Sequence, residues 1–151
     1  MVDSHKSPTD PLAKRHSKIL MPVNGTEVSR RAAEMAFALA RANDAQVTVL
    51  YVTRAAATAR RADGRSAGAA RRNDEAVLKD IGALAERYGV SVRRSIRGDT
   101  APDEAILKEA KRGYDLIVLG ANRRPGNTLF FGNAAAAVLE RLQIPKLFVA
   151  T

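Results

Sequence analysis

The feature that most constrains this chain is the regular alternation of short apolar runs with longer segments of helical periodicity. Five runs have the length and the apolar or β-branched character of strands: residues 19–23, 47–52, 90–96, 116–119 and 146–149. The segments between them repeat apolar residues at helical spacing, as Val28, Ala32 and Met35 do within residues 27–42. Strands that alternate with helices predict an α/β fold, in which helices cover both faces of a parallel sheet.

Three further helices are expected along the chain. One carries Val77, Ile81 and Leu84 and stops at Gly89, and an alanine-rich one spans about residues 133–142. Pro102 opens the third. Its neighbours Asp103 and Glu104, with Asp99, suggest a metal site, but their place at a helix N-terminus explains the two helical carboxylates more simply. We therefore predict no metal site.

Two strands are assigned a place in the sheet by their composition. Residues 116–119 are the most uniformly apolar run, which favours a central strand. The 90–96 run contains Arg93 and Arg94, and charged side chains are typical of an exposed sheet edge.

Charge is concentrated in one segment. The chain has 25 Lys and Arg residues against 16 Asp and Glu residues, a net charge of +9. Residues 54–72 alone contain 6 arginines and 1 aspartate and no large apolar residue, so we expect residues 54–73 to form a surface insertion or a disordered stretch. Two interpretations stay open: a solvated, variable insertion, or an arginine-rich arm, Arg60 to Arg72, for phosphate or an acidic membrane surface. Nucleic acid is the less favoured partner.

The rest of the composition excludes several classes of protein. With no cysteine there is no disulfide scaffold, thiol nucleophile or thiolate metal site. No apolar stretch is long enough to span a membrane, and the first sixteen residues lack the apolar core of a signal peptide, so a cytoplasmic location is expected. Residues 1–17 are polar and predict a tail or linker before a domain spanning 18–151. The only histidines, His5 and His16, lie in that tail, and no catalytic motif or acid/base pair is visible, so we do not expect an enzyme.

Two loops have the composition of a ligand site. Residues 22–26 follow the first strand and residues 120–133 follow the fourth. In open α/β sheets, ligands bind at the carboxyl ends of strands where the strand order reverses. The glycines of the second loop would allow sharp turns and close approach to a ligand, and the helix start at Gly132 favours phosphate. From spacing alone, an anion site and a set of ordinary turns with solvated arginines are equally good interpretations.

From Lys18 to Val149 the sequence resembles a universal stress protein domain. The supporting segments are KILMPVNGTEVSRRAAEMAFALA, QVTVLYV, RGDTAPDEAI and DLIVLGANRRPGNTLFFGNAAAAVLERLQIPKLFV. The resemblance implies a Rossmann-like fold with five parallel strands in the order 3-2-1-4-5. That order places the first and fourth strands side by side at the reversal. It also implies a regulatory module that binds an adenine nucleotide (ATP, ADP or AMP) and acts in the stress response without turnover, although some relatives hydrolyse ATP slowly.

Nucleotide-binding members of that family carry a loop of the pattern G-x2-G-x9-G-(S/T), which this chain matches only in part. Gly120 matches the first glycine, Arg123 replaces the second, and the third comes one residue early at Gly132, followed by Asn133. The acidic residue that commonly contacts the ribose is replaced by Asn24. The residues implied for nucleotide binding are Pro22, Val23, Asn24, Val52, Gly120, Asn122, Arg123, Gly132, Asn133 and Ala134.

The resemblance also implies partners. Family members usually dimerise through the last strand, here Leu147, Phe148 and Val149, and an unpaired apolar edge strand is a template for such pairing. The Arg-Arg-Pro-Gly sequence ahead of Leu129–Gly132 resembles stress-protein domains fused to cation/proton antiporters, which implies a transporter as parent or partner. The alternative function is therefore a dimeric interaction domain without nucleotide binding.

Overall fold

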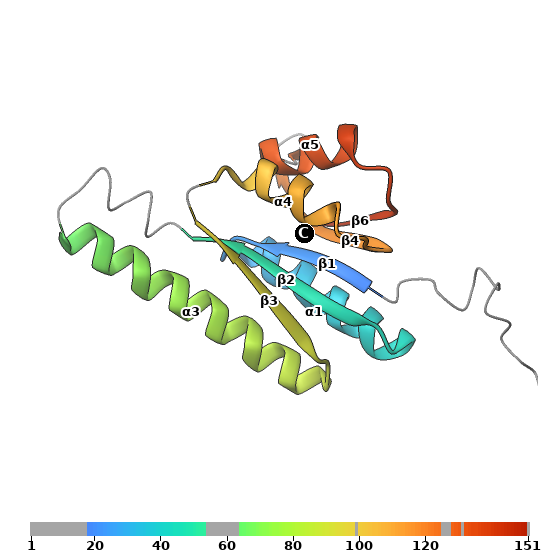
Figure 1. Cartoon of the computed structure of the whole chain (residues 1–151), viewed down its shortest axis with the longest axis horizontal. Coiled ribbons are helices and arrows are strands. Elements are labelled where there is room, and N and C mark those ends of the chain that lie inside the picture. Colours follow the sequence, from blue (N-terminus) through green and yellow to red (C-terminus); the bar gives the residue numbers. More distant parts are fainter. Residues whose placement is uncertain (1–17, 54–63, 99, 125–127, 131, 151) are drawn as a thin grey trace, which may run out of the picture.

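A computed structural model of the chain describes residues 18–53, 64–98, 100–124, 128–130 and 132–150 (Figure 1). Its strands are β1 (Lys18–Val23), β2 (Gln46–Val52), β3 (Val92–Arg97), β4 (Leu116–Arg124), β5 (Thr128–Phe130) and β6 (Lys146–Ala150). Its helices are α1 (Glu27–Asn43), α3 (Gly64–Tyr88), α4 (Pro102–Ala110) and α5 (Gly132–Arg141). The predicted tail, residues 1–17, lies outside the described residues.

The main sheet has five parallel strands in the order β3-β2-β1-β4-β6. Numbered along the chain as parallel strands, this is the predicted order 3-2-1-4-5, which is confirmed. Strand β1 is central and pairs with β2 from Lys18 opposite Gln46 to Val23 opposite Tyr51. The arginine-bearing strand β3 pairs with β2 at one end of the sheet, as expected for an edge strand.

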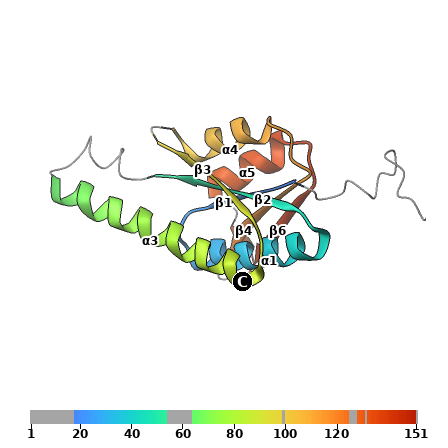
Figure 2. The same cartoon turned by 60° about the horizontal axis from the view of Figure 1, so that its bottom comes forward.

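Two apolar layers enclose the sheet, one on each face. On one face α1 and α3 pack against side chains such as Ile19, Met21 and Tyr51, and on the other α4 and α5 pack against Leu20, Leu50 and Ile117 (Figures 1 and 2). Successive residues of β1 and β2 alternate between the layers, as side chains along a strand must. Because both faces are covered, these strands are apolar along nearly their whole length.

Two segments differ from the sequence prediction. Residues 120–131 were expected to be a loop, but β4 continues to Arg124 and pairs antiparallel with β5, with Asn122 opposite Phe130. Residues 64–73 were expected to be part of a surface insertion, and they are the first turns of α3. Residues 54–63 of that insertion lie outside the described part of the chain. The end of α3 is as predicted: Gly89 adopts a φ of 67° directly after Tyr88.

One buried carboxylate joins α4 to the edge of the sheet. Glu109 is only 2% exposed and accepts hydrogen bonds from Ser95 Oγ (2.8 Å), Arg97 Nη2 (3.1 Å) and Tyr114 Oη (2.8 Å). Burial alone would raise the pKa of Glu109. The hydrogen bonds from Tyr114 and Ser95, with the charge of Arg112, outweigh burial and lower that pKa below its usual value. The ionised form is thus the one that the fold stabilises.

The substitution Glu109→Gln should reduce the stability of the domain in a pH-dependent way. A carboxylate with a depressed folded pKa stabilises the fold above its unfolded value of 4.5, and this contribution disappears as the pH falls through the folded value. We expect a loss of about 1–3 kcal/mol at pH 7 that shrinks toward acid. Urea unfolding at several pH values measures it. Glu86→Gln, an exposed neutralisation on α3, is the control and should change little. An equal loss at every pH would contradict the assignment.

Candidate functional site

The first and fourth parallel strands lie side by side and part toward their carboxyl ends. Strand β1 pairs with β4 at Ile19 opposite Leu116 and Leu20 opposite Ile117, whereas its register with β2 continues to Val23. The helix that follows β1 lies on one face of the sheet and the helix that follows β4 lies on the other (Figure 2). This is the reversal point at which an open α/β sheet forms a crevice.

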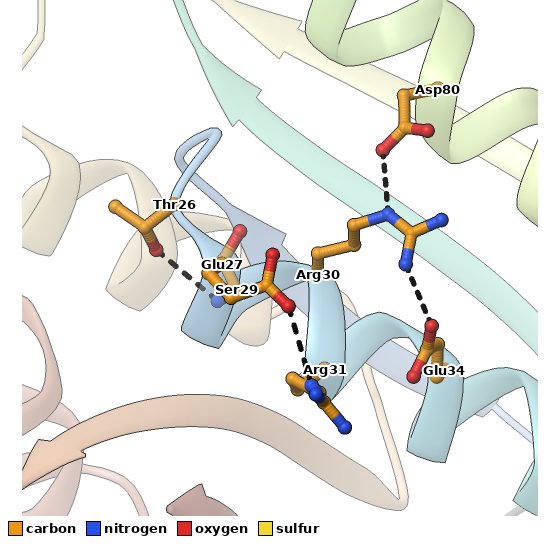
Figure 3. Close-up of polar contacts among 7 residues, drawn as sticks. All are labelled: Thr26, Glu27, Ser29, Arg30, Arg31, Glu34 and Asp80. Atoms are coloured by element: carbon orange, nitrogen blue, oxygen red, sulfur yellow. Dashed lines mark hydrogen bonds and ion pairs between the residues drawn. The ribbon is translucent and has the colours of Figure 1, made fainter. Parts of the chain in front are cut away.

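The turn that leaves β1 is held closed by its own side chains. The Oδ1 atom of Asn24 accepts hydrogen bonds from the backbone N–H (3.1 Å) and the hydroxyl (2.7 Å) of Thr26. Thr26 Oγ1 in turn accepts from the backbone N–H of Ser29 (3.2 Å; Figure 3). Ser29 Oγ accepts from the backbone N–H of Asn24 (3.2 Å). Gly25 between them has a φ of 82°, a conformation that suits glycine. Thr26 is the N-cap of α1, so this turn fixes where that helix begins.

Gly120 has a different structural role from the one predicted. It was expected to turn a loop sharply, but it lies inside β4 and is not among the described glycines of positive φ. A Cβ atom built on it would overlap Val28 of α1, meeting the backbone oxygen at 2.8 Å and the side chain more closely still. The missing side chain therefore lets the first turn of α1 lie directly on β4.

The other predicted residues are placed as follows. Val23 is buried, Pro22 and Val52 are half-buried, and Asn24 and Asn122 are exposed, all near the carboxyl ends of β1, β2 and β4. Arg123 is in β4, and Gly132, Asn133 and Ala134 open α5, but their side chains lie outside the described part. The carboxyl ends of β1, β2 and β4 lie at the same edge of the sheet, and contact between the two loops lies outside what the structure describes.

Helix α3 packs against the same turn from the α1 side, which the sequence did not reveal. Tyr51 Oη donates a 2.5 Å hydrogen bond to Asp74 Oδ1, and both residues are at least 95% buried. Tyr51 is the register partner of Val23, the last residue of β1. One turn along α3, Val77 lies against Gly25, where an added Cβ would come within 2.8 Å of the valine Cγ2. Strand β2 and helix α3 thus support the turn from behind.

A cavity of about 220 Å³ lies between the first turn of α1 and α3. Its lining combines small and apolar residues, among them Ser29, Ala76 and Ile81, with charged side chains that are already paired. Arg30 Nε donates to Asp80 (3.1 Å) and its Nη1 to Glu34 (2.8 Å), and the bond and charge of Asp80 raise the pKa of Arg30 (Figure 3). This cavity lies on the α1–α3 side of the turn and is distinct from the β1–β4 crevice.

Within the described residues there is no group of three or more His, Asp or Glu side chains that could hold a metal ion. Asp103 and Glu104 occupy the first turn of α4, and Asp99 lies outside the described part. None of the helices that the structure describes has both the length and the apolar character needed to cross a bilayer.

Comparison with known families identifies the chain's relatives. Residues 16–150 match the model of the universal stress protein family. The chain belongs to this family. It is 27% identical over 139 residues to universal stress protein MJ0531 of Methanocaldococcus jannaschii, a match that covers 89% of this chain and 82% of that protein.

Solved structures of universal stress proteins share the fold. One from Archaeoglobus fulgidus superposes with a TM-score of 0.70 at 19% identity, covering 87% of this chain and 97% of the other. An Arabidopsis thaliana family protein with AMP bound gives 0.60 at 18% identity, covering 89% and 91%. An A. fulgidus protein in complex with dAMP gives 0.63 at 15% identity, covering 87% and 96%. The names of these relatives give no support to the expected link with an antiporter.

The role found for Gly120 gives a direct prediction. Gly120→Ala should destabilise the domain by about 1–3 kcal/mol because the new methyl group meets the backbone of α1. Unlike a side chain, that backbone cannot move aside by changing its rotamer. Urea unfolding measures the change.

The matched control is Gly82→Ala in α3, where a Cβ would meet only the guanidinium of Arg94 at 2.8 Å. That flexible end can move aside, and alanine favours a helix over glycine, so this variant should be neutral or more stable. If the two substitutions had the same effect, the close packing of α1 on β4 would not be the reason for glycine at position 120.

Proposed function

We propose that this universal stress protein domain binds an adenine nucleotide in the crevice between β1 and β4 and acts as a regulatory module. The observation that carries the proposal is the separation of β1 from β4 beyond Leu20, at the point where the strand order reverses. The fold-sharing proteins with bound AMP and dAMP, and a further universal stress protein in complex with cAMP, support this ligand class.

The proposed contacts follow from the positions of the strand ends. The base and ribose would lie against Pro22, Val23, Asn24 and Val52, and the phosphates would lie near Asn122, Arg123 and the start of α5. The backbone N–H groups of the first turn of a helix have no helical partners, and the helix dipole favours an anion there. Asn24 already uses its Oδ1 within the turn, and its remaining polar group, an NH2, only donates. We therefore expect weaker selection for a free ribose diol than a carboxylate would give.

Calorimetric titration of the full chain with ATP, ADP, AMP, dAMP and cyclic AMP tests the proposal. At least one should bind, and Gly132→Val should weaken that binding by about tenfold, because a branched side chain at the first residue of α5 hinders approach to its free N–H groups. Ala136→Val, which places the same valine side chain at an exposed position of α5, is the matched control and should leave affinity unchanged.

Heat-silent titrations at about 1 mM of every nucleotide, together with no nucleotide released on denaturing the purified protein, would reject this function. The alternative, an interaction domain that does not bind nucleotides, would then be favoured.

We also propose that the domain forms a homodimer through β6. Among the described residues β6 pairs only with β4, so its outer edge offers backbone groups to a second strand. The three predicted interface residues are half-buried: Leu147 and Val149 pack on the α1 side of the sheet and Phe148 on the α4–α5 side. The outward-facing backbone groups of β6, rather than these side chains, would therefore make the pairing.

The register of β6 defines a selective test of this dimer. The N–H of Ile117 donates to the carbonyl of Pro145, so in a parallel ladder the backbones of residues 147 and 149 also face β4, and those of Lys146 and Ala150 face outward. Replacing both Lys146 and Ala150 by proline should remove outward N–H groups and give a folded monomer by light scattering. The control, Lys146→Ala with Ala150→Ser, keeps both N–H groups and should remain dimeric. A monomeric wild-type protein at micromolar concentration would contradict the proposal.

A further inference from the structure

Helix α3 extends well beyond the sheet that it covers. Its 25 residues span about 37 Å, whereas the seven residues of β2 span about 23 Å. The first buried side chain in the described part of α3 is that of Asp74, bonded to Tyr51 near the carboxyl end of β2. Residues 64–73, which we call the overhang, project past the ends of the strands (Figures 1 and 2). Ten helical residues are about 15 Å long.

The overhang offers almost no apolar surface. It consists of glycine, alanine, serine, asparagine and arginine, and it contains none of the large apolar residues that pack α3 farther along. Ala69, Arg71, Arg72 and Asn73 are exposed. A helix face with this composition cannot dock on another protein by burying hydrophobic surface, so any partner must be recognised by charge and hydrogen bonding.

Basic residues lie at the N-terminal end of α3 and acidic residues lie farther along it, the reverse of the order that the helix dipole favours. The overhang has three arginines, Arg65, Arg71 and Arg72, and no acidic residue, whereas residues 74–88 have four acidic residues and two basic ones. The N-terminal end of a helix dipole is positive, so it favours acidic side chains, and α3 has none in its first turn. Gly64 and Gly68 lower helix propensity further. The dipole acts mainly in the first turn, so it disfavours Arg65, and an external anion would compensate the charge of all three arginines.

We propose that the overhang is an electrostatic docking surface for anionic phospholipid headgroups. A helix end that projects from the body can reach a planar surface, and each arginine near such a surface contributes to adsorption without insertion. The overhang contains no aromatic residue on which unpaired bases could stack, which makes single-stranded nucleic acid the poorer fit. The proposal does not depend on nucleotide binding.

Vesicle co-sedimentation of the full chain tests this surface. The protein should bind vesicles of mixed phosphatidylcholine and phosphatidylglycerol, fail to bind pure phosphatidylcholine, and detach as salt rises from about 50 to about 200 mM. The double substitution Arg71→Glu with Arg72→Glu should weaken binding by about tenfold or more. Both residues are exposed, so their substitution removes no buried packing, and circular dichroism verifies that the variant keeps its helix content.

The matched control changes the same charge on the packed half of the same helix. Lys79→Glu with Arg87→Glu, also at exposed positions, should retain most of the vesicle binding. Equal loss in both variants would show a general effect of net charge and overturn the proposal, as would absence of binding to the anionic vesicles. Tighter binding of duplex RNA or DNA than of anionic vesicles at the same salt, lost in the Arg71/Arg72 variant, would overturn the lipid assignment and identify nucleic acid as the partner.

Discussion

The close approach of α1 to β4 is the constraint on which the arrangement of this domain depends. Helix α1 connects β1 to β2, yet its first turn lies on β4, the strand on the other side of β1. This position is open only because Gly120 has no side chain where Val28 and its carbonyl lie. With α1 filling one face at this point, the helix after β4 packs on the opposite face, and the two strands separate toward their carboxyl ends.

The turn between β1 and α1 is held by hydrogen bonds within it and by the packing of α3 against it. From within, the side chains of Asn24, Thr26 and Ser29 satisfy the backbone groups that a turn into a helix leaves unpaired. From behind, α3 contributes Val77 against Gly25 and the buried bond from Tyr51 to Asp74. Both hydrogen-bonding groups are buried, so loss of either residue would take a hydrogen bond away from a buried polar group. The turn at the proposed site is consequently held in place before any ligand arrives.

The sequence was sufficient to predict the sheet, but it was not sufficient to predict the contacts between elements. Periodicity identified the five parallel strands because their apolar runs report burial directly. It missed β5, since three residues after a Pro-Gly pair carry no period and the hairpin depends on pairing with β4. It also missed the start of α3, because the overhang is helical without an apolar stripe. Nothing in the sequence marks Glu109 or Asp74 as buried, since their partners Tyr114 and Tyr51 are brought to them only by tertiary packing.

The departures from the family's glycine pattern have separate physical consequences. At position 120 glycine is required by the packing of α1 on β4, so its presence says nothing by itself about phosphate. At position 24 the asparagine holds the turn through its Oδ1, a task that an aspartate could also perform, so the exchange alters charge rather than backbone shape. For the proposed site, recognition of an anion would then depend on backbone N–H groups at the start of α5 and on arginine in β4. A site of that kind would select for phosphate more strongly than for the sugar.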